Sequence, residues 1–110
     1  MNDFRERDWI VFRDLGPILI ERYWERCVAE LKRIMEAGAA TNRDLYWNIV
    51  EAAKAQREEA RDMFDGCGRS AAFFKILRIN SNGLFTEKEL GQFSNELRAS
   101  LDDLKRMRGS

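Results

Sequence analysis

The sequence contains no histidine, and its 110 residues include one proline and two cysteines. Without imidazole there can be no Ser-His-Asp triad and no histidine base that titrates near neutral pH. The Glu-x-x-His pairs of di-iron bundles are excluded in the same way. Two cysteines are too few for a disulfide framework, so reduced thiols in a cytoplasmic setting are expected. No catalytic residues are assigned, and the sequence favours a protein that is not an enzyme.

The sequence also lacks an excess of charge of either sign, because 19 basic residues balance 19 acidic ones. Broad nucleic-acid-binding faces are driven by phosphate neutralisation, so net neutrality argues against this class of partner. No uncharged apolar run approaches the roughly 20 residues of a membrane helix, and the charged first residues do not resemble a signal segment. We therefore expect a soluble, cytoplasmic protein without a membrane partner.

What is present favours helix. The apolar fraction is 45%, the charged fraction is 35%, and a single proline interrupts the chain. This composition is typical of an ordered globular chain, and the length suits a single helical domain over residues 1–110. An amphipathic pattern predicts a short helix over residues 3–14, which Gly16-Pro17 should end.

Two long amphipathic helices are predicted next, over about 17–37 and 42–64. In the first, the apolar residues Ile20, Trp24, Cys27, Leu31 and Ile34 recur at helical spacing and form the predicted core-facing stripe, which Tyr23, Val28 and Met35 widen. Thr41, with Asp44 three residues later, resembles a capping box at the start of the second. Because the helices have similar lengths and a short connection, an antiparallel helical hairpin is expected.

Glycines at positions 66 and 68 predict a turn, and a C-terminal helix–loop–helix should follow over about 70–107. Its first helix is predicted over 70–77. Its second helix should open at a capping box of Thr86 and Glu89 and run to about residue 107. The apolar positions of this last helix are Leu90, Phe93, Leu97, Leu101 and Leu104. The predicted fold class is all-α, with four to five helices.

The connection in this helix–loop–helix is a turn at Asn80-Ser81-Asn82-Gly83, and Glu89 follows the glycine by six residues. Over about residues 73–97 the pattern resembles a degenerate EF-hand, the helix–loop–helix calcium module. The resemblance implies that Asn80, Asn82 and Glu89 occupy ligand positions. Arg78 stands at the first ligand position, where a guanidinium repels a cation, so we expect neither calcium nor any other metal or cofactor. An ordinary tight turn explains the same residues equally well.

Aromatic residues are plentiful for a chain of this size. Adjacent helical residues point about 100° apart, so Tyr46 and Trp47 cannot both face one core. Trp9 and Phe12 lie on a helix that is apolar on more than one side. Either a wide core-facing arc accounts for these residues, or a second subunit or partner covers them. These four residues form the candidate interface, and the leading hypothesis is a small helical protein that acts through protein–protein association as a homodimer.

Two other functions remain open from the sequence. Arg98, Lys105, Arg106 and Arg108 give the C-terminus a basic edge, although Asp102 and Asp103 interrupt it. A small nucleic-acid-binding regulator is therefore one alternative. A metal-free, EF-hand-like module that binds a peptide is another. Cys67, between two glycines, is either a reactive thiol or an incidental loop cysteine.

Overall fold

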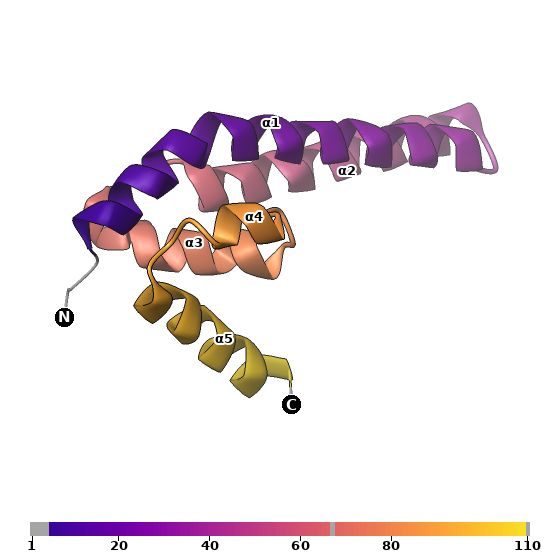
Figure 1. The fold of residues 1–110 in the computed structure, drawn as a ribbon. Helices are drawn as coiled ribbons and strands as arrows, with labels where there is room; N and C mark the ends of the chain where they lie inside the picture. Colours follow the sequence, from indigo (N-terminus) through magenta and orange to yellow (C-terminus); the bar gives the residue numbers. More distant parts are fainter. Residues whose placement is uncertain (1–4, 67, 110) are drawn as a thin grey trace. The chain divides into compact units, whose positions relative to one another are not determined.

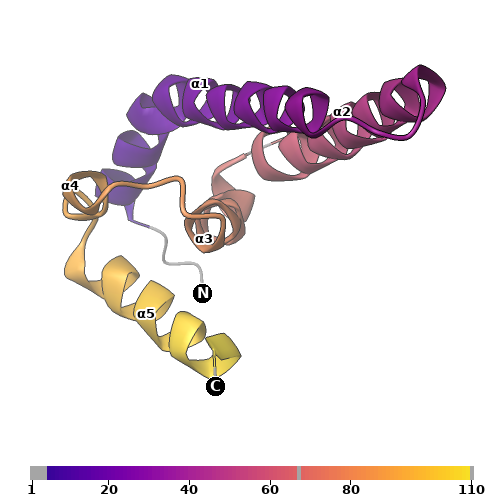
Figure 2. The same cartoon turned by 90° about the vertical axis from the view of Figure 1, so that its right-hand side faces the viewer.

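The computed structural model describes residues 5–66 and 68–109, and every regular element in these residues is helical (Figures 1 and 2). The elements are α1 (Glu6–Ala37), α2 (Asn42–Phe64), the 3-10 turn η1 (Arg69–Ala71), α3 (Ala72–Ser81), α4 (Glu87–Leu90) and α5 (Asn95–Gly109). The all-α prediction is confirmed.

The chain forms two compact units. The hairpin unit is Ile20–Asp65, and the terminal unit combines Met1–Leu19 with Gly66–Ser110. Helix α1 contributes residues to both units. The expectation of a single domain over residues 1–110 stays a prediction.

The predicted break at Gly16-Pro17 is wrong, because Pro17 lies inside α1. A proline in a helix interior costs about 3 kcal/mol, since it removes one backbone hydrogen bond and crowds the preceding turn. Phe12, Leu15 and Leu19 are all buried around it. Burial of these side chains, each worth roughly 1.5–3 kcal/mol, offsets that cost and keeps the helix continuous.

The hairpin unit forms as predicted. Gly38 has a positive φ of 72°, which suits a residue that ends a helix, and α1 stops one residue earlier. The Thr41 hydroxyl accepts a hydrogen bond of 3.0 Å from the Asp44 backbone N–H and caps α2. Residues 20–37 of α1 and the whole of α2 run side by side in opposite directions (Figures 1 and 2).

In the terminal unit the C-terminal helix–loop–helix is present, but its helices differ from the prediction. Helix α3 continues to Ser81, beyond the predicted end at residue 77. The single helix predicted from Thr86 to about 107 is wrong, because it is divided into α4 and α5. The division lies at Gly91–Ser94, where Phe93 is buried and Ser94 begins a new helix. The buried apolar residues of this unit are Phe12, Leu15, Leu19, Ala72, Ile76, Ile79, Leu84, Phe93, Leu97 and Leu101.

A buried carboxylate joins the start of α1 to the start of α5. Oδ1 of Asp8 accepts a 2.7 Å hydrogen bond from the Ser94 backbone N–H, and Oδ2 accepts one of 2.7 Å from the Ser94 hydroxyl. The Ser94 hydroxyl oxygen in turn accepts from the Leu97 N–H at 3.2 Å. Asp8 is only 2% exposed. Its charge therefore lies at the N-termini of two helices, where the helix dipoles favour an anion.

Candidate functional site: an apolar face on the hairpin

The two helices of the hairpin unit are joined by a small polar cluster. The Tyr23 hydroxyl lies 2.8 Å from Oε1 of Glu59 and 3.0 Å from the Gln56 carbonyl oxygen, two acceptors for its one proton. Nε2 of Gln56 donates to the Cys27 carbonyl oxygen at 3.2 Å. Burial raises the pKa of Tyr23 and that of the Cys27 thiol, and Glu59 raises both further. These bonds fix the register of α1 against α2.

Next to this core-facing side, α1 carries a second apolar stripe that remains accessible. Ile20 is 37% exposed, Trp24 38%, and Val28 and Met35 51% each. The half-buried Leu31 falls between Val28 and Met35 at the same helical spacing. The expectation that Trp24 belongs to the core stripe is therefore wrong. The buried residues of this part of α1 are instead Tyr23 and Cys27.

Helix α2 shows the same arrangement. The half-buried residues Leu45, Ile49 and Ala52 recur at helical spacing toward the buried Met63. Each is followed by one apolar residue that faces a different direction: Tyr46, Val50 and Ala53. Tyr46 is 60% exposed, and Val50 and Ala53 are half-buried.

The two stripes lie on one face of the hairpin. In both helices the accessible stripe follows the core-facing stripe by one residue, a rotation of about 100° in the same sense. Because the helices are antiparallel, the same rotation carries both stripes to the same side. We call this surface the hairpin face. Its residues are Ile20, Trp24, Val28, Leu31 and Met35 from α1 and Tyr46, Val50 and Ala53 from α2.

The four residues of the candidate interface fall in different surroundings. Phe12 is 8% exposed and belongs to the core of the terminal unit, where the half-buried Trp9 packs edge-on against it at 6.5 Å between ring centroids. Tyr46 lies on the hairpin face. Trp47, 51% exposed, follows at the edge of that face and packs edge-on against Tyr46 at 5.5 Å. The structure thus leaves two of the four aromatic rings largely accessible.

Sequence reasoning missed Trp24, Val28 and Met35 as surface residues, because it merged two adjacent stripes of α1 into one broad core-facing stripe. A signal was present. Trp24 follows Tyr23, Val28 follows Cys27, and Met35 follows Ile34. A helix with two neighbouring apolar stripes has more apolar surface than one partner helix can cover.

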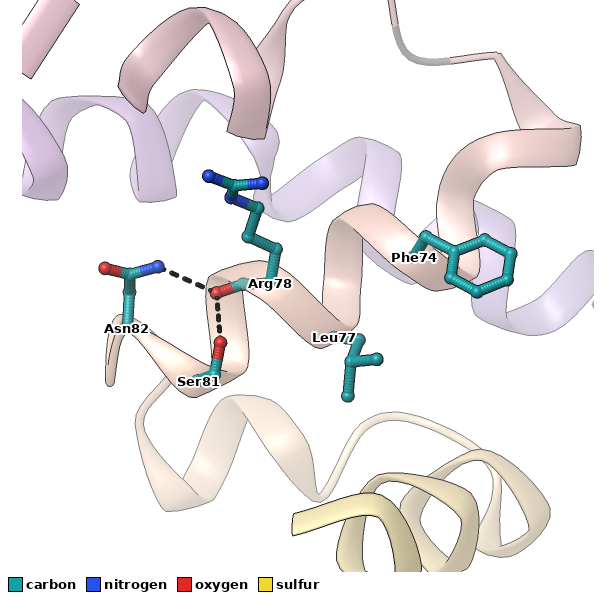
Figure 3. Close-up of a pocket in the computed structure, with 5 residues that line it drawn as sticks. All are labelled: Phe74, Leu77, Arg78, Ser81 and Asn82. Atoms are coloured by element: carbon teal, nitrogen blue, oxygen red, sulfur yellow. Dashed lines mark hydrogen bonds between the residues drawn. The ribbon is translucent and has the colours of Figure 1, made fainter. Parts of the chain in front are cut away.

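The turn that resembles an EF-hand has the geometry of a helix end. Arg78 and Asn80 lie within α3. The Ser81 hydroxyl and Nδ2 of Asn82 each donate to the Arg78 carbonyl oxygen at 2.9 Å (Figure 3). Gly83 takes a positive φ of 70°. Oε1 of Glu89 accepts a hydrogen bond of 2.9 Å from the Thr86 backbone N–H, as part of a capping box. An EF-hand loop instead aims such oxygens at a shared cation.

We expect calcium to leave the thermal stability of the protein unchanged. The Glu89 carboxylate in α4 already accepts a hydrogen bond from the Thr86 backbone N–H, and Arg78 places a positive charge in the last turn of α3. The measurement is the melting temperature with calcium at about 5 mM, well above the dissociation constants of most EF-hands, and with a chelator in its place. An upward shift of more than about 2 °C would contradict this expectation, since ligand binding to the folded state raises stability.

The shallow hollow beside this turn is lined by one helix and its cap, with Phe74, Leu77, Arg78, Ser81 and Asn82 around it (Figure 3). Phe74 is 70% exposed.

On the basic edge of α5, Nη2 of Arg106 pairs with Asp103 at 2.6 Å. Cys67 and the side chains of Lys105 and Arg108 lie outside the described residues. Residues 5–66 and 68–109 contain no cluster of three or more Cys, Asp or Glu side chains that could hold a metal ion.

Within the part of the chain that the structure describes, no helix combines the length and the apolar character needed to cross a bilayer. No protein-family model matches the chain, and neither a curated protein nor a solved structure matches it.

Proposed function

We propose that this protein works by protein–protein association, without catalysis, and that it is a homodimer formed through the hairpin face. The observation that carries the proposal is the apolar stripe repeated on both helices of the hairpin unit. Ile20, Trp24, Val28 and Met35 are between 37% and 51% exposed. Large accessible apolar patches on soluble proteins mark association sites.

A two-helix hairpin buries only one side of each helix, and a second hairpin laid on the same face completes a four-helix bundle. The size of the face fits this partner. Residues 20–37 span about 27 Å at 1.5 Å per residue, and two packed helices are about 18–20 Å wide. Roughly 500 Å² per copy, or about 1,000 Å² in total, lies at the lower limit of a specific interface. A reversible dimer follows from that area.

The sequence supports the absence of catalysis, since a chain without histidine lacks the usual proton-transfer group near neutral pH. The buried free thiol of Cys27 supports a reducing compartment, and we place the protein in the cytoplasm. The charge of the chain is balanced, which favours a protein partner over nucleic acid.

The test is sedimentation equilibrium over a range of about 5 to 500 µM, which brackets the affinity expected for a small, reversible interface. We expect the average mass to rise from monomer toward dimer across this range. Val28→Lys places a charge in the centre of the hairpin face and should weaken association by about tenfold or more, because a charge loses hydration when it is buried.

Ile18→Lys is the matched control. Ile18 is 50% exposed and Val28 is 51% exposed, and both lie on α1, but Ile18 belongs to the terminal unit. The control should associate like the unaltered chain. Circular dichroism should show equal helix content in both variants. A mass that remains monomeric up to the highest concentration would overturn the proposed function, and so would equal loss of association in both variants.

A further inference from the structure

The hairpin face carries charges at one end, in a pattern that specifies how a second copy docks. On α1, Glu21 and Glu25 flank the stripe that begins at Ile20 and Trp24. On α2, Arg57 and Arg61 continue the stripe of Tyr46, Val50 and Ala53 at helical spacing. All four charged residues are exposed. At this end of the face, α1 is thus edged by acidic residues and α2 by basic residues.

The charges of opposite sign lie at matching heights along the hairpin. The bond between Tyr23 and Glu59 sets the level at which α1 and α2 meet. Glu21 lies two residues before Tyr23 in α1, and Arg61 lies two residues after Glu59 in α2. Glu25 lies two residues after Tyr23, and Arg57 lies two residues before Glu59. Because the helices are antiparallel, Glu21 and Arg61 lie at one height along the hairpin, and Glu25 and Arg57 lie at another. Within one hairpin, the acidic residues are on α1 and the basic residues are on α2.

Two hairpins can stack on this face around a two-fold axis in two ways. If the axis is parallel to the helices, α1 of each copy lies antiparallel on α2 of the other, and every residue keeps its height. If the axis crosses the helices, α1 lies on α1 and the heights are reversed. Only the first arrangement brings acidic edges onto basic ones at matching levels. Complementary charges of this kind fix orientation and register at an interface.

We propose that the partner is a second copy of this chain whose α2 packs antiparallel against α1, with Glu21 opposite Arg61 of the second copy and Glu25 opposite Arg57 of the second copy. This inference rests on the proposed function, because it assigns the partner and its orientation to the same face. Two-fold symmetry repeats each pair, so four ion pairs border one apolar centre. Met35 then packs at the level of Tyr46 of the second copy, near the loops.

Charge reversal tests the arrangement. One variant combines Glu21→Arg with Glu25→Arg, and the other combines Arg57→Glu with Arg61→Glu. Each alone should associate about tenfold more weakly than the unaltered chain at low salt, because all four pairs become repulsive. An equimolar mixture of the two should recover association as a mixed dimer, since each reversed edge then meets its complement. Added salt should reduce both effects.

The control combines Glu51→Arg with Glu58→Arg, which makes the same charge change on exposed residues of α2 that point away from the face. It should associate like the unaltered chain. If the unaltered chain dimerises but neither reversal weakens it, or if the mixture associates no better than its components, the docking arrangement is overturned while the proposed function stands. If the unaltered chain itself remains monomeric, both are overturned.

Discussion

Replacing Asp8 by alanine should lower the free energy of unfolding by about 2–4 kcal/mol, far more than a typical surface change. The Asp8 carboxylate accepts from both the backbone N–H and the hydroxyl of Ser94, at 2.7 Å each, and is 2% exposed. Its removal leaves two buried donors without an acceptor, and each costs about 1–3 kcal/mol. The measurement is the urea unfolding of the whole chain at neutral pH, monitored by circular dichroism.

Asp14→Ala is the matched control, because Asp14 lies on the same helix with its side chain 68% exposed and only a 3.6 Å ion pair to the neighbouring Arg13. We expect it to change stability by less than about 0.5 kcal/mol. Asp8→Asn should fall between the two, since an amide keeps one acceptor oxygen but loses the charge at two helix N-termini. If Asp8→Ala lowered the free energy of unfolding by less than about 1 kcal/mol, water or Ser94 itself would satisfy the two donors that lose their acceptor.

The elements that could be predicted from the sequence are those with local signals. Gly38 marks the end of α1 and Thr41 marks the start of α2 through their own local preferences, so the predicted connection between the two helices matches the observed one. The capping box of Thr86 and Glu89 is local in the same sense. Such signals act within a few residues and do not depend on the rest of the fold.

The elements that could not be predicted depend on distant contacts. Ser94 was an unremarkable residue in a continuous helical pattern, and it begins a helix because Asp8, 86 residues away, holds its N–H and hydroxyl. Pro17 predicts a break by its local propensity, yet the helix continues because residues on both sides of it are buried. Tertiary contacts override local propensity at both positions.

The candidate site shows a third limit. Periodicity showed that α1 is apolar over a wide arc, but it could not show which part of the arc meets α2. That choice depends on the register set by Tyr23 with Gln56 and Glu59, two polar residues of another helix. Once this register is known, Trp24, Val28 and Met35 follow as the accessible stripe. Tyr46 and Trp47 are accessible for a simpler reason, since neighbours on a helix cannot both face one core. Their role as an interface stays a prediction.

Raising the pH above about 10 should destabilise the hairpin unit through Tyr23. Burial, with the Glu59 carboxylate and Cys27 beside the hydroxyl, raises the pKa of Tyr23 above its usual range. The folded state therefore keeps a proton that the unfolded chain releases near pH 10. The stability contributed by the neutral phenol is complete below that pH and is lost as the pH rises toward the folded pKa. The loss is about 1.4 kcal/mol per pH unit. The raised pKa of the Cys27 thiol acts in the same direction.

Tyr23→Phe separates this linkage from the loss of a hydrogen bond. At neutral pH the variant should be less stable by about 1–2 kcal/mol, because the Glu59 and Gln56 oxygens lose their donor. Between pH 10 and 12 it should lose about 2–3 kcal/mol less than the unaltered chain, since it has no proton to release. The measurement is the free energy of unfolding in guanidinium across this range. Tyr46→Phe is the control, because the only other tyrosine is 60% exposed and its ionised ring would stay in water. Parallel pH profiles for the unaltered chain and Tyr23→Phe would show that the hairpin accommodates a charged phenolate beside Glu59, contrary to its burial.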